Sequence, residues 1–307
     1  MSALVVVTDW GFPSLDPERA AFEGRGIELR AYQCHTEEEV LAVVADADVV
    51  MAQWAPLRKR AIEAMSRCRG IVRYGIGLDN IDLEAAAARG IPVRNVPDYC
   101  LEEVADHTLA LLLSLQRQIS SVDRRLRSGT WKITPPLPLP PLRLSVLGLV
   151  GFGRIARLVA RRARAFEMQV RAFDPMVNDD QFAGEGVTRV ELPELFSDSD
   201  IVSLHCPLTD ETRAIVNAGT LAQMKPSALL VNTSRGGLID TAALTEALGR
   251  GTIAGAGLDV FDPEPLPADH PLCGLESVVL TSHTAWYSNA SVAELQRKAA
   301  QAALALL

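Results

Sequence analysis

The chain has 307 residues, of which 48% are hydrophobic and 5% aromatic, and its formal net charge is −8. This length allows two domains with a core each, and the composition excludes a disordered chain. The acidic balance argues against broad binding to nucleic acid or anionic membranes, because neither polyanion gains from an acidic partner.

Three further observations bear on compartment and metal binding. The five cysteines are scattered, with no CxxC pair and no Cys/His cluster, so we expect no metal site and a reducing compartment. The opening "MSALVVVTDW" predicts a first strand and not a signal peptide, because it lacks a basic start and its apolar run ends at Asp9. No apolar stretch approaches the ~20 residues of a membrane span, so we expect a cytoplasmic protein.

The first hundred residues alternate short β-branched runs with alanine-rich helical runs. We expect strands in "LVVVTD", "IELRAY", "ADVVMAQ", "GIVRYG" and "IPVRNV", and helices in "EEEVLAVVADA" and "IDLEAAAARG". Strand–helix alternation at this spacing predicts a parallel sheet in an open α/β domain.

The segment 101–127 is one continuous apolar-striped stretch, longer than a typical globular helix. Such a helix can serve the core of one domain and also pack against a partner subunit. The five prolines between residues 135 and 141 predict an extended connection after it.

Strand–helix alternation resumes at Leu144. Strands are expected in "LSVLGLV", "MQVRAFD", "DIVSLH", "SALLVNTS", "IAGAGLDV" and "SVVLTSH", with helices up to about Phe166, in "LPELF", in "TAALTEALGR" and in the closing "ASVAELQRKAAQAALALL". We find no short internal repeat, and the two halves are similar α/β units. The predicted domains are 1–99, completed by 285–307, and 100–284.

A nucleotide-binding signature lies in the second half. Gly151, Gly153 and Ala156 form a GxGxxA pattern that follows a strand and opens a helix, and the next strand ends at Asp174. Gly151 permits a tight turn, Gly153 lets the backbone approach a pyrophosphate, and the helix N-terminus offers free N–H groups. Asp174 suits ribose hydroxyls and repels a 2′-phosphate, which favours NAD over NADP. The alternative is a packing glycine and a strand-end aspartate without a ligand.

Three reactive side chains follow three later strands. Arg235, Glu264 and His283 come after "LLVNTS", "IAGAG" and "SVVLTS", and the carboxyl ends of parallel strands share one edge of a sheet. An imidazolium can protonate a carbonyl oxygen as hydride reaches the carbon, and a carboxylate on its other nitrogen stabilises that form. A guanidinium can bind a 2-oxo acid through its planar fork. The trio therefore predicts reduction of a 2-oxo acid.

Each of these residues alone also fits an ordinary structural role. Arg235 can be a solvated loop residue, Glu264 a turn carboxylate between two prolines, and His283 a helix cap or core histidine. Their joint placement after the cofactor motif favours catalysis.

The motifs in their order resemble the D-2-hydroxyacid dehydrogenase family. "VLGLVGFGRIAR", "VNTSRGGLID", "GAGLDVFDPEP" and "TSHTAW" carry the resemblance, and "RYGIGLDNID" and "NVPDYCLEEVADHTLALLLSLQR" extend it upstream. "EEVADHTL" and "HTAWYS" are closer to the C-terminal binding protein branch. The chain departs from the family at Ser282, where proline is usual, and in its "PPLPLPP" run.

The resemblance implies a Rossmann NAD-binding domain inserted into a flavodoxin-like substrate domain, and a homodimer formed through the cofactor domain. It implies that Arg235 binds substrate, Glu264 assists, and His283 is the acid/base. The backbone of Tyr74, Gly75, Ile76 and Gly77 would hold the substrate carboxylate, and Trp286 would shape an apolar pocket or pack between domains. The positions that match dinucleotide contacts are Thr108, Phe152, Gly153, Arg154, Ile155, Asp174, His205, Cys206, Pro207, Thr212, Asn232, Thr233, Ser234 and Asp259.

Two hypotheses follow from the sequence. The first is an NAD-dependent reductase of small 2-oxo acids, with no nucleic-acid or membrane partner. The second is an NAD(H)-sensing scaffold like the C-terminal binding proteins, which can keep the same trio. The lack of long polar tails favours the enzyme.

Overall fold

The computed structural model describes residues 2–134 and 140–307, which form two compact units. Unit 1 consists of Met1–Cys100 and Tyr287–Leu307, and unit 2 of Leu101–Trp286. The chain therefore leaves unit 1 to build unit 2 and returns to unit 1 at its end. Of the proline run at 135–141, residues 135–139 lie outside the described part of the chain.

Unit 1 is built on a five-stranded parallel sheet in the order β2-β1-β3-β4-β5. Its strands are β1 (Ala3–Val7), β2 (Ile27–Ala31), β3 (Val49–Ala52), β4 (Gly70–Arg73) and β5 (Val93–Arg94). Its helices are α1 (Asp16–Phe22), α2 (Glu37–Val44), α3 (Lys59–Ala64), α4 (Leu83–Ala88) and α12 (Asn289–Leu304). This strand order is flavodoxin-like, as the family resemblance implied.

Unit 2 is built on a seven-stranded parallel sheet in the order β12-β11-β10-β9-β6-β7-β8. Its strands are β6 (Val146–Val150), β7 (Gln169–Phe173), β8 (Thr188–Arg189), β9 (Ile201–Leu204), β10 (Leu229–Asn232), β11 (Gly255–Leu258) and β12 (Val278–Leu280). This is a Rossmann-like sheet in which the order of the strands reverses between β6 and β9.

Seven α-helices and three short 3-10 turns complete unit 2 in the described residues. The helices are α5 (Leu101–Gln116), α6 (Ile119–Arg127), α7 (Arg154–Ala165), α8 (Asp179–Gly184), α9 (Leu192–Asp198), α10 (Ala218–Gln223) and α11 (Thr241–Arg250). The 3-10 turns are η1 (Leu142–Leu144), η2 (Gly236–Leu238) and η3 (Pro271–Gly274). None of the described helices is both long enough and apolar enough to cross a lipid bilayer.

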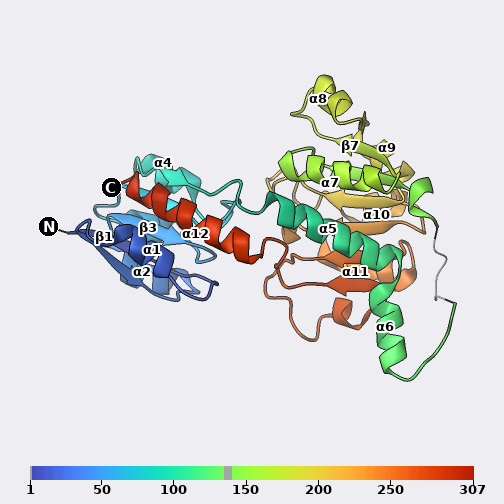
Figure 1. Ribbon diagram of the computed structural model, residues 1–307, viewed down its shortest axis with the longest axis horizontal. Coiled ribbons are helices and arrows are strands. Elements are labelled where there is room, and N and C mark those ends of the chain that lie inside the picture. Colours follow the sequence, from blue (N-terminus) through green and yellow to red (C-terminus); the bar gives the residue numbers. More distant parts are fainter. Residues whose placement is uncertain (1, 135–139) are drawn as a thin grey trace. The chain divides into compact units, whose positions relative to one another are not determined.

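Helices cover both faces of the seven-stranded sheet. Helices α5 and α7 lie beside each other (Figure 1) and share one buried apolar cluster with Leu147, Leu149 and Val231. Helices α9, α10 and α11 share the opposite cluster with Val202 and Leu230. Because successive residues of a strand point to opposite faces, the continuous apolar runs of the sequence serve both layers.

The long stretch 101–127 is two helices and not one. Gln118 adopts a left-handed conformation (φ 53°) and separates α5 from α6. Before the break, α5 packs closely on β11. A Cβ on Gly257 of β11 would lie only 3.1 Å from the side chains of Leu111 and Leu115. The sequence carries no glycine or proline at the break, so its pattern predicted continuity.

The two units anchor their sheets with the same pair of contacts. In unit 1 the Leu4 N–H donates to Asp48 Oδ2 at 2.7 Å, and the Asp48 N–H donates to the Leu4 carbonyl. In unit 2 the pair is Val146 and Asp200, with 2.8 Å for the N–H to Oδ2 contact. Each aspartate precedes the strand that pairs with the first strand of its unit.

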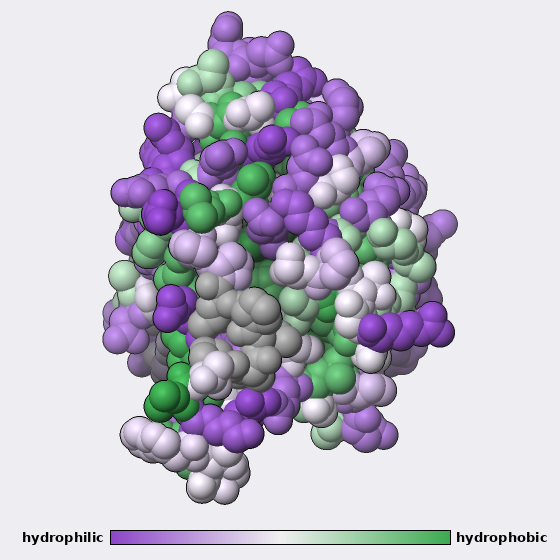
Figure 2. All heavy atoms as spheres, turned by 90° about the vertical axis from the view of Figure 1, so that its right-hand side faces the viewer, coloured by the Kyte–Doolittle hydropathy of each residue, from purple (hydrophilic) through white to green (hydrophobic). Residues whose placement is uncertain are grey.

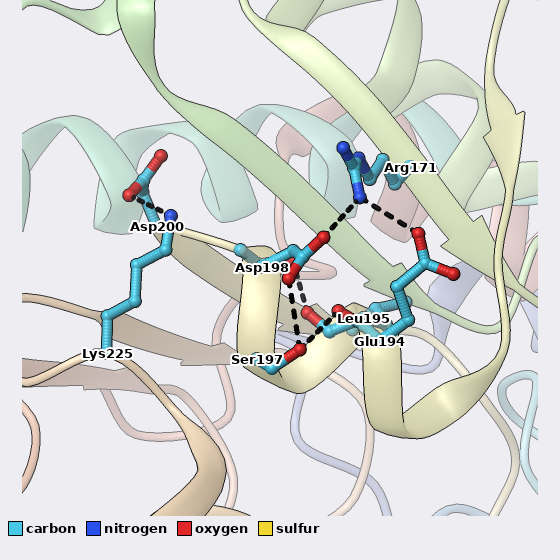
Figure 3. A network of polar contacts seen from close by, with 8 residues as sticks. Arg171, Glu194, Leu195, Ser197, Asp198, Asp200 and Lys225 are labelled. Carbon is cyan, nitrogen blue, oxygen red and sulfur yellow. Dashed lines mark hydrogen bonds and ion pairs between the residues drawn. The ribbon is translucent and has the colours of Figure 1, made fainter.

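A cation neutralises each anchoring aspartate. Arg67 binds Asp48, and Lys225 Nζ lies 2.7 Å from Asp200 Oδ1. Figure 3 shows the Asp200–Lys225 pair next to a second ionic cluster, in which Arg171 bridges Glu194 and Asp198. These contacts tie strand ends to neighbouring helices and loops.

We expect Asp48→Asn to lower the free energy of unfolding by about 1–3 kcal/mol at pH 7, because the substitution removes a buried, paired charge. The Arg67 hydrogen bond lowers the pKa of Asp48 against the opposing effect of burial. The difference in unfolding free energy between wild type and Asp48→Asn should therefore be fully present above ~3.9, the pKa of an aspartate in the unfolded chain. It should be lost as the pH falls through the lower pKa of Asp48 in the folded protein. Urea unfolding of both proteins between pH 7 and 2.5 measures this difference. Exposed Glu84→Gln is the control, and an equal effect of both substitutions would contradict the anchoring role.

Candidate functional site

The glycine motif lies where the exits of β6 and β9 meet. Gly151 has φ 92°, and a Cβ there would lie 2.7 Å from the backbone nitrogen of Cys206 and 2.8 Å from the carbonyl carbon of His205. Both the turn and the close approach of the neighbouring loop therefore require glycine. This point is the switch point of the sheet, where open α/β sheets bind ligands.

Gly153 is needed for a different reason. It has φ −74°, and a Cβ built on it meets no heavy atom within 4 Å, so the protein's own packing does not require glycine. It directly precedes α7, and no side chain of the described residues caps that helix, whereas Asn178 and Asp240 cap α8 and α11. The open glycine and the uncapped N-terminus fit the pyrophosphate of a dinucleotide.

Asp174 lies at the exit of β7 and faces the same loop. Its Oδ2 accepts the Phe152 N–H and its Oδ1 accepts the Met176 N–H, both at 2.8 Å. The carboxylate oxygens keep further lone pairs for ribose hydroxyls. The Phe152 ring is stacked on Phe182, with centroids 4.7 Å apart, and the Arg157 guanidinium carbon lies over the Phe152 ring, 5.5 Å from its centroid.

The exit of β9 contributes groups without charge near neutral pH. Burial lowers the pKa of His205 to about 4, and its Nε2 lies 2.9 Å from Ser203 Oγ. Burial also raises the pKa of the Cys206 thiol to about 11. Thr212 Oγ1 donates to the Pro207 carbonyl at 2.6 Å and closes the loop. His205 and Cys206 therefore add no charge next to the glycine turn.

The exit of β10 carries Arg235. Asn232 is fully buried, accepts the Ser234 N–H and donates to the Arg235 carbonyl at 2.8 Å, which fixes the turn. A Cβ on Gly236 would lie 1.9 Å from the carbonyl carbon of Phe261, so only glycine lets this turn touch the loop after β11. Thr233 and Thr108 are buried and share a hydroxyl hydrogen bond of 2.8 Å.

Glu264 and His283 form a direct pair. His283 Nδ1 and Glu264 Oε2 are 2.8 Å apart, and Glu264 Oε1 accepts the Phe261 N–H at 2.8 Å. Burial opposes the charge of Glu264, but the His283 hydrogen bond and charge, with a smaller effect of Arg235, lower the pKa of Glu264 below its ordinary value. The carboxylate is therefore ionised at neutral pH.

Asp259 holds the loop that carries His283. Its side chain is fully buried, and its carboxylate accepts the Thr281 hydroxyl and the N–H groups of Thr284 and Ala285. Its carbonyl accepts the His283 N–H at 2.7 Å. The carboxylate therefore serves the loop, and the dinucleotide contact of Asp259 that the resemblance implied stays a prediction.

The segment Tyr74–Gly77 follows β4 in unit 1. The Tyr74 side chain is fully buried, its N–H donates to the Ala52 carbonyl, and the Gly75 N–H donates to the Arg73 carbonyl. These two N–H groups are thus bound within the protein, contrary to the expectation that they hold a substrate carboxylate. Of this segment, only the N–H groups of Ile76 and Gly77 remain as expected contacts of the substrate carboxylate.

Three residues of the site were not identified from the sequence. Gly236 lets the turn of Arg235 contact the loop after β11. Thr281 donates a hydrogen bond to Asp259, and His107 contacts Thr281. Gly236 follows Arg235 directly and His107 precedes Thr108, but their contacts join segments far apart in the chain. In the part of the chain that the structure describes, no group of three or more His, Cys, Asp or Glu side chains is arranged to hold a metal ion.

The fold and the site together define a dinucleotide-dependent oxidoreductase: a glycine turn at the switch point of a Rossmann-like sheet, with an imidazole–carboxylate pair and a guanidinium at neighbouring strand exits. Residues 109–285 match the family model described as D-isomer specific 2-hydroxyacid dehydrogenase, NAD binding domain. The chain belongs to this family, it binds NAD through this domain, and it is a dehydrogenase of 2-hydroxy acids.

Relatives and solved structures agree with this assignment. The chain is 42% identical over 255 residues to a glyoxylate reductase of Korarchaeum cryptofilum (81% of this chain, 76% of the relative). It is 39% identical over 289 residues to a hydroxypyruvate reductase of Thermotoga maritima (92% of each). The crystal structure of an Aquifex aeolicus D-lactate dehydrogenase complexed with NAD and lactic acid matches with a TM-score of 0.88 at 28% identity, covering 98% of this chain and 94% of that one.

Some relatives are much longer. The chain spans about half the length of the D-3-phosphoglycerate dehydrogenases that it matches, with 53% coverage of the protein from Mycobacterium tuberculosis at 38% identity.

The two motif glycines should respond differently to alanine. We expect Gly153→Ala to leave the thermal midpoint of the apoprotein within about 2 °C and to weaken NADH binding by about tenfold or more, because the methyl group occupies ligand space. Gly151→Ala should lower the midpoint by several degrees, because it meets the backbone at Cys206. Calorimetry and NADH titration measure both effects. Unchanged NADH affinity in Gly153→Ala would contradict the assigned pyrophosphate site.

Proposed function

We propose that His283, Glu264 and Arg235 carry out the reduction of a small 2-oxo acid to the D-2-hydroxy acid. One observation carries this proposal: the 2.8 Å contact between His283 Nδ1 and Glu264 Oε2 at a strand exit next to the turn of Arg235. Because Nδ1 is bound to the carboxylate, Nε2 is the nitrogen left to face a substrate.

Each residue then has a distinct role. NADH, when bound, supplies the hydride for the carbonyl carbon of the substrate. His283 donates the proton that the carbonyl oxygen needs, and Glu264 stabilises the protonated imidazole and fixes its orientation. Arg235 binds the substrate carboxylate and carbonyl and stabilises the oxygen as negative charge develops.

The substrate-facing residues outside the trio are proposed from the resemblance and from local geometry. The N–H groups of Ile76 and Gly77 are the remaining candidates of their loop for the substrate carboxylate. The names of the relatives favour glyoxylate and hydroxypyruvate as first substrates to test. Trp286, which is partly buried, would favour an additional apolar side chain on the 2-oxo acid.

The proposal predicts NADH oxidation with at least one of glyoxylate, hydroxypyruvate, pyruvate and 4-methylthio-2-oxobutanoate, and formation of the D product. His283→Ala should lower kcat by about 10²–10⁴-fold, since it removes the proton donor, and leave NADH affinity within about twofold. His35→Ala, at an exposed position of unit 1, is the matched control. Equal losses of kcat and NADH affinity in His283→Ala would make His283 a structural residue.

A second candidate is an NAD(H)-responsive binding protein of the C-terminal binding protein kind. The segments "EEVADHTL" and "HTAWYS" favour that branch of the family. The same substrate panel separates the two functions: tight NADH binding without turnover of any 2-oxo acid supports the binding protein.

We further propose that the protein prefers NAD to NADP. The Asp174 carboxylate lies at the glycine turn, with Oδ2 2.8 Å from the Phe152 nitrogen. Its negative charge would repel the 2′-phosphate of NADP. All five cysteines are free thiols, which supports the expected cytoplasmic location.

We also propose a homodimer that forms through unit 2. Helix α6 and the segment after it expose large apolar side chains: Ile119 56%, Leu126 52%, Trp131 79% and Ile133 90%. A groove runs between α6 and residues 130–134, and Figure 2 shows hydrophobic side chains at the surface on this side of unit 2. Exposed apolar patches of this kind are typical of protein–protein interfaces.

The dimer proposal predicts a mass in solution of twice one chain. Trp131→Ser combined with Ile133→Ser should raise the dimer dissociation constant by about tenfold or more, because apolar contact area is lost. Sedimentation velocity across a concentration series measures this change. Met176→Ser removes another side chain of unit 2 that is 89% exposed and serves as the control. A monomeric wild type would overturn the dimer.

A further inference from the structure

A chain of polar contacts leads from helix α5 to the loop that carries His283. His107 Nε2 lies 2.9 Å from Thr281 Oγ1, and Thr281 Oγ1 lies 2.5 Å from Asp259 Oδ1. These residues come from α5 and from the exits of β12 and β11. His107 has no part in the proposed reaction itself.

The donors and acceptors fix the direction of this chain. The Thr281 hydroxyl has one hydrogen and donates it to the Asp259 carboxylate. The Thr281 oxygen is left as an acceptor, so the hydrogen in its contact with His107 must belong to His107 Nε2. His107 is therefore the donor that orients the Thr281 hydroxyl toward Asp259.

The loop at the end of this chain has an unusual conformation. His283 has φ 54°, in the left-handed region that non-glycine residues occupy uncommonly. Its N–H is held by the Asp259 carbonyl, and the next two N–H groups are held by the Asp259 carboxylate. A backbone in this region persists only where neighbouring contacts hold it.

Helix α5 is a rigid base for such contacts. Leu109, Leu111 and Leu112 are buried in the core of unit 2. The residue after His107, Thr108, bonds to Thr233, two positions before Arg235. His107 bonds to Thr281, two positions before His283. One turn of α5 thus contacts the two strand exits that carry the guanidinium and the imidazole.

We propose that His107 is a positioning residue for His283. It acts through Thr281 and Asp259 and keeps the His283 loop in the conformation that directs the imidazole to Glu264. The proposal rests on the proposed acid/base role of His283 for its effect on turnover, but the positioning itself is a property of the protein alone.

The kinetic test uses a graded set of substitutions. His107→Leu should lower kcat by about ten- to hundredfold, the loss typical of a displaced catalytic group, and leave NADH affinity within about twofold. His107→Gln should restore most of kcat, because its amide nitrogen reaches the position of Nε2. His107→Asn should not restore kcat, because the amide nitrogen of the shorter side chain reaches only the position of Nδ1 and not that of Nε2.

A second readout does not depend on turnover. The chain has five histidines, so NMR of imidazole-labelled protein can resolve His283. His107→Leu and His107→Asn should shift or broaden the His283 signals, and His107→Gln should leave them close to wild type. His35→Leu, a histidine substitution at an exposed position of unit 1, is the matched control. If His107→Leu does not fold, the His283 signals of His107→Gln and His107→Asn are compared instead, and they decide whether His107 positions His283.

The outcomes separate the two proposals. Absence of wild-type turnover with any 2-oxo acid would overturn the catalytic function, while changed His283 signals in His107→Leu or His107→Asn, with near wild-type signals in His107→Gln, would still support positioning. Unchanged His283 signals in both the Leu and the Asn variants would overturn the role of His107, whatever the turnover. A Gln variant as impaired as the Leu variant would overturn it as well.

Discussion

The conformation of the loop that carries His283 depends on the buried carboxylate of Asp259. A carboxylate removed from water is stable only where donors surround it, and here a threonine hydroxyl and two backbone N–H groups fill that need. All three donors come from residues 281–285, so satisfying the charge also fixes the backbone on both sides of His283. These contacts hold the His283 backbone in its left-handed conformation, and in this conformation the imidazole contacts Glu264.

The same principle organises the opposite ends of the two sheets. Asp48 and Asp200 accept a backbone N–H from the first strand of their units and bind a cation, Arg67 or Lys225. These acids thus register strands in both units, and each is the second aspartate of a D-x-D pattern before an apolar run, in "DADVV" and "DSDIV". Glycine has the complementary role, since Gly151 and Gly236 allow backbone contacts that any side chain would block.

The site combines neutral and charged regions with different tasks. Around the glycine turn, burial keeps His205 and Cys206 uncharged, and the N-terminus of α7 is left open for an anion. At the exits of β10 to β12, Glu264 is ionised and paired with His283. The open helix N-terminus suits an anionic group, and the ionised carboxylate suits a paired imidazole.

The sequence by itself determined the α/β alternation, the parallel sheets, the glycine turn with Asp174, and the three strands that deliver Arg235, Glu264 and His283, because periodicity and turn chemistry are local properties. It did not determine the break at Gln118, the short helices α1, α3, α8 and α10, or the engagement of the Tyr74 and Gly75 N–H groups. Only the tertiary structure decided that Asp259 holds the loop and that His107 reaches Thr281. Those contacts join residues 22 to 174 positions apart, and no local pattern encodes which distant donor fills a buried acceptor.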